Sequence, residues 1–315
     1  MQFPTLSDIQ QAHKIIKPFI HHTPVMTSEN LNQITGADIY FKCENFQKAG
    51  AFKIRGACNA VLSLTQDEAS AGVTTHSSGN HAAAIALAAK WRGIKAFVVM
   101  PENAPQVKKD AVASYGAEII FCEPTLQARE KTLDDVVKRT GAGFIHPYNN
   151  PKVIAGQGTS VLELLEETGE LDIVVTPVGG GGLLSGTCLT TSALFPGTSV
   201  IAAEPSQADD AFRSFKAGKI IPVINPDTIA DGLRTSLGSL TFPIIQKYVS
   251  EIITVDEQDI INAMRLTWER LKIIIEPSSA VPLAAVLANP DKFRNKRTGI
   301  ILTGGNVDLS KIPWL

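Results

Sequence analysis

Cysteine is scarce in this sequence: its 315 residues include four, at positions 43, 58, 122 and 188. Their spacing contains no CxxC pair and matches no zinc site. We therefore predict free, mostly buried thiols in a reducing compartment, where disulfides rarely persist. The first sixteen residues are polar and amphipathic, and they lack the apolar core and cleavage signature of a signal peptide. A cytoplasmic location is expected.

An excess of one charge and long apolar runs are also missing. The 29 Lys and Arg residues nearly balance the 31 Asp and Glu residues, which leaves a formal net charge of −2. Such a balance gives no basic face for nucleic acid. Gly, Pro or a charged residue interrupts every apolar run well before the length needed to span a bilayer. We expect no nucleic-acid or membrane partner.

What the sequence does contain is a regular alternation of short β-branched segments and Ala-rich helical segments. This pattern is typical of parallel sheets covered by helices, an α/β architecture, and such sheets bind ligands at the carboxyl ends of their strands. Glycines that follow two of the helical segments, Gly93 and Gly116, are expected to end those helices. The predicted helices are 80–92, 105–115, 126–140 and 258–272, and the predicted strands are 38–44, 72–76, 95–100, 118–122, 172–178, 199–204, 251–255 and 298–303.

Four residue clusters follow or adjoin these strands, and the first is KAGAFKIRGA at 48–57. Lys53 lies between two glycines and next to Phe52. Partial desolvation by its apolar neighbours would lower the pKa of this lysine and favour the neutral amine that forms a Schiff base. A solvated basic helix start is an equally good interpretation of this segment alone.

The second cluster is THSSGNHAAA at 75–84, where a strand ends and a helix begins. Small polar residues and glycine at such a point leave backbone N–H groups directed into a cleft, which suits a carboxylate or another anion. Ser77 and Ser78 add hydroxyl groups, and Asn80 and His81 add side-chain donors. A simple helix cap accounts for one of these residues but not for the whole run.

The third cluster is TPVGGGGLLSG at 176–186, with four consecutive glycines after a hydrophobic strand. Glycines allow the backbone to wrap closely around a phosphate at the start of the next helix. The spacing of Gly180, Gly182 and Ser185 is also close to a dinucleotide-binding fingerprint. Glu204 lies near the position expected for an acid that binds the ribose. This segment alone supports the two hypotheses equally.

The fourth cluster is ILTGGNVD at 301–308, at the end of the last strand. Thr303 would direct its hydroxyl group from the end of that strand into the same crevice. An ordinary strand-to-turn transition is the alternative explanation.

Together the clusters resemble the serine/threonine dehydratase and serine racemase family of tryptophan-synthase-like, fold-type-II pyridoxal-phosphate (PLP) enzymes. Six further segments resemble the family in the same order: HHTPV, FKCEN, AGQGT, EPSQADD, ADGLRT and EPSSA. The resemblance implies two α/β domains with parallel-rich sheets and the cofactor in the cleft between them. It places a large domain at 1–66 plus 150–315 and a small one at 67–149. A dehydrogenase would have no use for the segments around Lys53 and Ser78.

The resemblance also implies roles for single residues. Lys53 would carry PLP as a Schiff base and take the Cα proton from one face of the substrate, and Ser78 would move a proton on the opposite face. Phe52 would pack beside the cofactor ring, Asn80 would bind its phenolic oxygen and Thr303 would meet its pyridine nitrogen. The phosphate would be held by Gly179, Gly180, Gly181, Gly182 and Leu183.

Substrate and metal contacts follow from the same resemblance. In racemase-like members Glu204, the carbonyl of Ala208, and Asp210 bind a divalent cation, and oxygen ligands of this kind suit Mg²⁺ or Ca²⁺. A solvated acidic loop is the alternative for these residues. The candidates for the carboxylate and side chain of the substrate are Ser77, Ser78, His81, Arg129 and Thr235.

The reaction depends on how many acid–base groups face Cα. Racemisation requires two opposed groups, whereas one base and a leaving hydroxyl group suffice for dehydration. A neutral Thr303 hydroxyl at the pyridine nitrogen would leave that nitrogen unprotonated and favour prompt loss of the β-hydroxyl group. We therefore predict β-elimination of water from L-serine or L-threonine, and the resulting aminoacrylate-type product hydrolyses to a 2-oxo acid and ammonia. Serine racemase with dehydratase activity and threo-3-hydroxyaspartate ammonia-lyase are the alternatives.

The 3-hydroxyaspartate alternative requires a cationic side chain for the distal carboxylate of the substrate, and Arg234 is a candidate.

A homodimer is the expected assembly, both from the resemblance and as the commonest symmetry. Two positions depart from the family pattern. Residues 49–51 read AGA where relatives often carry Thr or Ser, and Tyr148 stands where some racemases have Asn.

Overall fold

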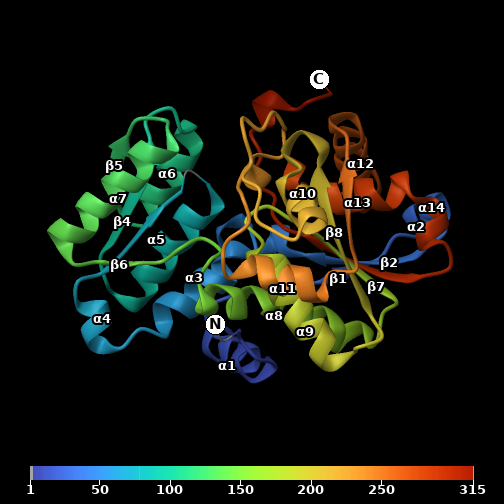
Figure 1. The fold of residues 1–315 in the computed structure, drawn as a ribbon, viewed down its shortest axis with the longest axis horizontal. Coiled ribbons are helices and arrows are strands. Elements are labelled where there is room, and N and C mark those ends of the chain that lie inside the picture. The colour runs from blue at the N-terminus through green and yellow to red at the C-terminus, as the bar shows by residue number, and fades with distance from the viewer. Residues whose placement is uncertain (1–2, 78, 315) are drawn as a thin grey trace.

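The computed structural model describes residues 3–77 and 79–314, and it contains two sheets in two halves of the molecule (Figure 1). The larger sheet has the order β1 (Val25–Met26), β2 (Asp38–Cys43), β10 (Arg297–Leu302), β7 (Ile173–Pro177), β8 (Ser199–Pro205) and β9 (Glu251–Val255). The smaller has the order β5 (Glu118–Cys122), β4 (Ala96–Pro101), β3 (Val73–His76) and β6 (Gly143–Phe144). Neighbouring strands are parallel everywhere except between β1 and β2.

The expected α/β architecture is confirmed, and each of the eight predicted strands is present with its ends shifted by at most one residue. The two strands that the sequence did not predict, β1 and β6, have two residues each. An alternation of polar and apolar residues cannot be recognised over so short a segment.

Helices cover both faces of the larger sheet, because alternate residues of its buried strands point to opposite sides. Ile201 and Ala203 of β8 pack with one layer, and Val200 and Ala202 pack with the other. The first layer contains α2 (Glu29–Thr35), α12 (Glu257–Leu271) and α13 (Pro277–Ala288), with the short α14 (Pro290–Phe293) beside them. The second contains α1 (Leu6–Ile16), α8 (Pro151–Thr168), α9 (Gly182–Leu194), α10 (Asp210–Ala217) and α11 (Thr241–Tyr248).

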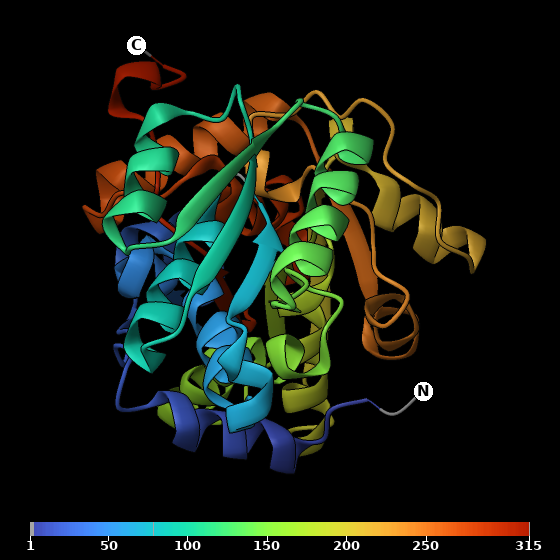
Figure 2. The same ribbon diagram turned by 90° about the vertical axis from the view of Figure 1, so that its left-hand side faces the viewer.

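The smaller sheet is covered in the same way (Figure 2). Val98 and Met100 of β4 pack against α5 (Asn80–Arg92) and α6 (Gln106–Ser114), and Phe97 and Val99 pack against α7 (Leu126–Thr140). The helix α3 (Lys53–Leu62) joins the two halves, since it packs on α5 and also on α8. A short helix, α4 (Gln66–Ser70), leads from it into β3. The four small-sheet strands lie inside 67–149, and the exact domain limits stay a prediction.

Several sequence predictions about single residues are also confirmed. Gly93 and Gly116 have φ angles of 73° and 86°, the left-handed region in which glycine ends a helix at low cost. All four cysteines are buried and free of disulfides. Among the residues that the structure describes, no helix has both the length and the apolarity to cross a bilayer.

Candidate active site

The four clusters meet at the carboxyl ends of the strands, and the turn after β10 connects three of the segments involved. The backbone N–H of Phe52 donates to the carbonyl of Thr303 at 2.9 Å, and the N–H of Gly305 donates to the carbonyl of Gly50 at 2.9 Å. On the other side of the turn, the N–H of Glu276 donates to the carbonyl of Gly304 at 2.9 Å. The turn at 303–306 therefore fixes the segment before Lys53 against the start of α13.

Lys53 is the first residue of α3, and its amine lies in a largely desolvated place. The Nζ atom is 3.4 Å from the carbonyl oxygen of Pro147 and 5.0 Å from the ring centre of Phe52. Burial lowers the pKa of Lys53 to about 8, although the carboxylate of Glu276 acts in the opposite direction. A lysine with such a pKa is neutral far more often than a surface lysine, which suits a Schiff-base amine.

A buried ionic cluster that the sequence did not predict holds the start of α3. The guanidinium group of Arg55 is fully buried and donates to Glu44 at 2.7 and 2.8 Å and to Glu163 at 2.8 and 2.6 Å. Lys42 pairs with the same Glu163 at 2.9 Å. The Arg55 and Lys42 cations lower the pKa of Glu163 to about 2, against the effect of its burial. Because buried charges require complete pairing, this cluster holds the turn that carries Lys53 rigidly.

Asn80, at the start of α5, is held between two polar side chains. Its Nδ2 atom lies 2.9 and 3.1 Å from the two carboxylate oxygens of Glu276, and its Oδ1 atom accepts from Asn306 at 2.9 Å. Burial raises the pKa of Glu276 to about 7, and the negative charge of Asp231 adds to that effect. Neither Glu276 nor Asn306 was among the predicted site residues, although Glu276 lies in the EPSSA segment and Asn306 in the GGN segment.

Thr303 is buried at the end of β10, where its hydroxyl oxygen is 2.9 Å from the hydroxyl oxygen of Ser279. Ser279 in turn donates to the carbonyl of Gly304 and accepts from the N–H of Gly304, both at 2.7 Å. The position of the Thr303 hydroxyl is therefore set by α13 as well as by its own strand.

The glycine segment forms the connection from β7 to α9. Gly181 has a φ angle of 86°, and the carbonyl of Gly180 accepts from the hydroxyl of Thr241 at 2.8 Å. The first N–H groups of α9 have no partner inside the helix and can bind an anion. A Cβ atom on Gly180 would lie 2.2 Å from a ring carbon of Tyr148, so only glycine fits there.

The loop after β3 is described in part. The hydroxyl of Ser77 accepts from the N–H of Gly79 at 3.3 Å, and among the described residues no side-chain hydrogen bond caps the start of α5. His81 is buried, and its Nε2 atom lies 3.3 Å from the carbonyl oxygen of Ile145. Ser78 lies outside the described residues, and its role stays a prediction.

A row of rings continues from β3 and β6 towards the glycine segment. His76 stacks on Phe144 at 5.6 Å, and His146 meets Phe144 at 5.6 Å and Tyr148 at 4.5 Å, between ring centres. The Nδ1 atom of His146 accepts from two backbone N–H groups, those of Tyr148 at 3.3 Å and Asn149 at 3.0 Å. This nitrogen is therefore unprotonated.

The surroundings of His76, His81 and His146 also favour the neutral form of each ring. Burial lowers the pKa of His146 to about 4, and the nearby His76 and Lys53 act in the same direction. Burial also lowers the pKa of His76, with Arg129 as its charged neighbour, and the pKa of His81 is well below its usual value. No carboxylate is among the charged groups that act on these three histidines within the described residues. Arg129 and Lys53 are the cationic neighbours of this wall, and the carboxylates of Asp210 and Glu130 act on Tyr148 at its end.

The predicted substrate contacts at 234 and 235 have different surroundings. A Cβ atom on Gly179 would lie 3.2 Å from the hydroxyl oxygen of Thr235, which places Thr235 beside the glycine segment. Arg234 is exposed, and its Nε atom donates to the carbonyl of Thr228 at 2.9 Å. The side chain of Arg234 is thus bound within its own loop.

The predicted cation ligands lie at the end of β8. Glu204 accepts from the N–H groups of Ala211 at 2.9 Å and Phe212 at 2.8 Å. Both carboxylate oxygens of Asp210 are buried and form no hydrogen bond of ordinary length among the described residues, although the backbone N–H of Leu237 acts on this carboxylate and lowers its pKa. Burial raises the pKa of Glu204 to about 9 and that of Asp210 to about 7. No group of three or more His, Cys, Asp and Glu side chains in the described part of the chain could hold a metal, so a site here depends on the carbonyl of Ala208.

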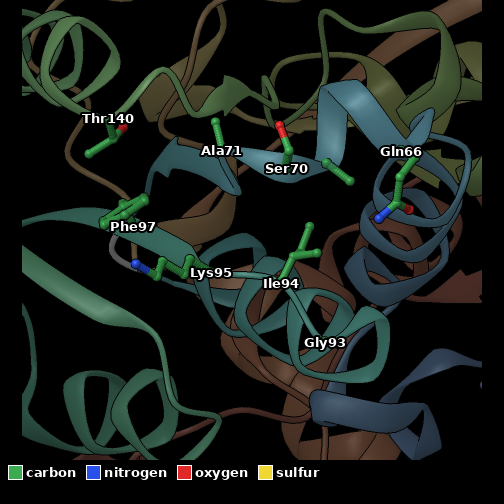
Figure 3. Close-up of a pocket in the computed structure, with 9 residues that line it drawn as sticks. Gln66, Ser70, Ala71, Gly93, Ile94, Lys95, Phe97 and Thr140 are labelled. Atoms are coloured by element: carbon green, nitrogen blue, oxygen red, sulfur yellow. The ribbon is translucent and has the colours of Figure 1, made fainter.

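A hollow of another kind lies elsewhere in the molecule (Figure 3). It has a volume of about 580 Å³, and it lies at the amino ends of β3 and β4, between α4 and the end of α7. Among the described residues that line it, Lys95 alone is ionisable. Because the chemical groups described above are at the opposite ends of these strands, this hollow is not the candidate active site.

Two parallel-rich α/β halves, a desolvated lysine at a helix start and a glycine segment before a second helix define the fold-type-II class of PLP enzymes. The chain belongs to the family described as pyridoxal-phosphate dependent enzymes, whose profile matches residues 16–304. This result confirms the resemblance and excludes the dinucleotide interpretation of the glycine segment. The residues present also fit PLP. Lys53 provides an amine, the glycine segment leaves space that a Cβ atom would fill, and the first N–H groups of α9 are free to bind a phosphate.

Individual relatives show how close the similarity is. The chain is 57% identical to a beta-hydroxyaspartate dehydratase of Paracoccus denitrificans (strain Pd 1222) over 100% of both chains. It is 54% identical to a serine racemase of Dictyostelium discoideum, whose crystal structure matches with a TM-score of 0.93 over 97% of this chain and 99% of that one. A threonine deaminase from T.th. is 43% identical, with a TM-score of 0.93 over 97% and 99% of the two chains.

Proposed function

We propose that this enzyme removes water from a small 3-hydroxy amino acid by β-elimination, and that the resulting enamine takes up water to give a 2-oxo acid and ammonia. The observation that carries the proposal is the desolvated Lys53, whose pKa of about 8 suits a base that acts near neutral pH. PLP, when bound, would supply the electron sink for the negative charge that develops at Cα. L-Serine and L-threonine are the first substrates to test.

The residues around Lys53 would hold the cofactor. The glycine segment, Leu183 and the start of α9 would bind its phosphate, because their N–H groups lie at the positive end of a helix. Asn80 would donate to its phenolic oxygen, and Thr303 would meet its pyridine nitrogen. Phe52, whose ring is 5.0 Å from the Lys53 amine, would pack beside the cofactor.

Lys53 would also move protons. Its Nζ atom would take the Cα proton, and the rigid Arg55 cluster would keep that atom in one place during the transfer. The start of α5, with the Ser77 hydroxyl and backbone N–H groups, would bind the α-carboxylate of the substrate. Racemisation would need a second group on the opposite face, and Ser78 is the predicted one.

A second candidate substrate, 3-hydroxyaspartate, is favoured by the wall around His76. The Nε atom of Arg129 is buried and has no hydrogen-bond partner among the described residues, and Arg129 is the charged neighbour of His76. A second carboxylate on the substrate would accept from this buried N–H group, whereas serine and threonine carry no second carboxylate that could do so. The Paracoccus relative is named for a substrate of this kind.

One experiment separates these possibilities. The PLP-loaded enzyme is incubated with L-serine, L-threonine or threo-3-hydroxyaspartate, and the 2-oxo acid and the D-amino acid are quantified by chiral chromatography. Lys53→Ala is the inactive control. A 2-oxo acid with little D-amino acid supports the proposal, whereas racemisation as the main reaction, or no product from any substrate, contradicts it.

The choice of substrate is tested by Arg129→Gln. We expect KM for 3-hydroxyaspartate to rise at least about tenfold, the effect of losing a charge-assisted bidentate contact, with less change for serine. Arg139→Gln, on the same helix but exposed and beside Glu118, is the matched control. Equal effects of Arg129→Gln on both substrates would remove the argument for a distal carboxylate site.

We further propose that Glu204, the Ala208 carbonyl and Asp210 bind Mg²⁺ or Ca²⁺. The support is the pair of buried Asp210 oxygens, which a cation would neutralise.

A homodimer in the cytoplasm stays the expected form of the protein. Analytical ultracentrifugation checks the assembly.

A further inference from the structure

The turn at 303–306 carries one polar side chain that none of the roles above uses. Asn306 follows Thr303, Gly304 and Gly305, and it lies between the larger half of the molecule and the start of α5. Its Nδ2 atom donates to the carbonyl of Ala49 at 2.8 Å and to the Oδ1 atom of Asn80 at 2.9 Å. Both protons of the Asn306 amide are therefore committed, one to each segment.

The contact with Asn80 decides which way the Asn80 amide faces. Asn80 Oδ1 meets the donor on Asn306, and Asn80 Nδ2 meets the carboxylate of Glu276. If the Asn80 amide were turned by 180°, its N–H groups would face the N–H donor of Asn306. Its oxygen would face the carboxylate of Glu276, so that two acceptors would meet there. One N–H directed between the two Glu276 oxygens can satisfy both, which leaves the second N–H for a ligand.

The contact with Ala49 supports an unusual backbone. Ala49 has a φ angle of 55° although it is not glycine, and Gly50 follows with a φ angle of 69°. A non-glycine residue in this region is strained, and it persists where its surroundings impose this conformation. The amide of Asn306 on the Ala49 carbonyl, and the N–H of Gly305 on the Gly50 carbonyl, are two such restraints. Three residues later the chain reaches Lys53.

We propose that Asn306 is a positioning residue that fixes the orientation of the Asn80 amide and the conformation of the loop before Lys53, and so sets how tightly PLP is held. The proposal rests on the proposed contact between Asn80 and the cofactor, but it does not depend on which substrate the enzyme uses. Asn306 acts through Asn80 and Ala49, and it is not itself assigned a contact with the reacting atoms.

The first test is Asn306→Asp, which keeps the shape but replaces two donors with acceptors. Asn80 would then have to turn its amide towards the new carboxylate at position 306, which would leave its oxygen facing Glu276. We expect the dissociation constant of PLP to rise about tenfold, the usual size of a lost hydrogen bond that leaves acceptors unpaired, and the absorption maximum of the bound cofactor to shift. Asn306 is exposed, so folding should be retained, and circular dichroism checks this.

Asn45→Asp is the matched control. The amide of Asn45 also donates to a backbone carbonyl beside the same turn, that of Ile274 at 3.2 Å, and a Cβ atom on Gly305 would lie 3.3 Å from Asn45. No hydrogen bond joins Asn45 to Asn80 within the described residues, so PLP affinity should stay within about twofold. An equal loss in both variants would mean general damage to the turn and would overturn the proposal.

A double-mutant cycle supplies the second test. In an Asn80→Ala background, Asn306→Asp should change the PLP dissociation constant less than in the parent enzyme, because one of the two residues it acts through is gone and only the contact with Ala49 remains. The proposal would be overturned if Asn306→Asp weakened PLP binding as much in that background as in the parent enzyme. It would also be overturned if the single variant Asn306→Asp kept wild-type affinity and spectrum. Both tests measure PLP binding and not catalysis. They therefore remain valid even if the parent enzyme binds PLP but eliminates water from none of the three substrates.

Discussion

Individual side chains in this site owe their chemistry to opposing effects of burial and charge. Lys53 and Glu276 are a clear example, since desolvation pushes both towards the neutral form while each favours the charged form of the other. Burial is the larger effect on both residues. As a result, a lysine amine and a glutamate carboxyl both titrate near neutral pH in one site.

This balance predicts the effect of Glu276→Gln on Lys53. Loss of the carboxylate removes the one influence that raises the lysine pKa, so the neutral amine should form at lower pH. The rate at which the apoprotein binds PLP, measured against pH, should reach half its maximum near pH 8 in the parent and at a lower pH in the variant. Glu269→Gln, on the exposed face of α12, should leave the profile in place. A profile moved to higher pH would contradict the prediction.

His146 gives a second prediction at this scale. Its pKa is about 4 in the folded protein and about 6.5 in an unfolded chain, so the unfolded state binds more protons between these values. The stability that this histidine contributes is full above about pH 6.5 and is lost as the pH falls towards 4. In urea unfolding between about pH 4.5 and 7.5, His146→Asn should flatten this dependence. The exposed His22→Asn should retain the parent slope.

Secondary-structure elements gain their positions from polar contacts that cross between them. The helix α3 is the main example, because Arg55 in its first turn pairs with Glu44 after β2 and with Glu163 in α8. The charges are fully buried, so their pairing costs desolvation that only complete hydrogen bonding offsets. The cluster therefore fixes the position of α3 but adds little net stability to the fold.

The corresponding prediction concerns Arg55→Leu. It would leave two buried carboxylates without their main partner, and we expect a loss of about 3–5 kcal/mol in the free energy of unfolding. Urea denaturation of the apoprotein measures this. Arg265→Leu removes an exposed Arg–Glu pair from α12 and should have far less effect. Similar losses in both variants would argue against a special role of the buried cluster.

At the scale of the whole molecule, the site is completed by groups from both halves. Asn80 of α5 is held by Glu276 and Asn306 of the larger half, and an ion pair joins Lys108 of α6 to Asp231. The side chain of Asp231 is 46% exposed, so this pair is solvent-screened and weak. The halves are therefore held at the site by short polar contacts that ligand binding could rearrange.

Cation binding is the prediction that concerns overall stability. A ligand that binds only the folded state, present at about 100 times its dissociation constant, stabilises it by about 2.7 kcal/mol. Mg²⁺ or Ca²⁺ should therefore raise the melting temperature of the parent, and EDTA should reverse the rise. Asp210→Asn should remove this response, whereas Asp209→Asn, at the neighbouring position paired with Arg213, should keep it. A response that survives Asp210→Asn would place the cation elsewhere.

Much of this site could be predicted because its residues follow strand ends. Lys53, Asn80, the glycine segment and Thr303 stand at points where the pattern of β-branched and Ala-rich segments changes, and parallel strands bring such points to one edge. Glu276 and Asn306 could not be assigned in this way. Their importance arises from one side chain, that of Asn80, which reaches them across the two halves.

The sequence by itself determined the α/β architecture, the family and the chemical character of the site, because periodicity, glycine runs and lysine placement are local properties. Only the tertiary structure decided which polar groups meet. It bound Arg234 to its own loop, left the Arg129 guanidinium beside neutral histidines, and buried the Asp210 carboxylate near the backbone N–H of Leu237 without a hydrogen bond of ordinary length among the described residues. These outcomes depend on distances between segments far apart in the chain, and those distances are fixed by packing rather than by spacing in the sequence.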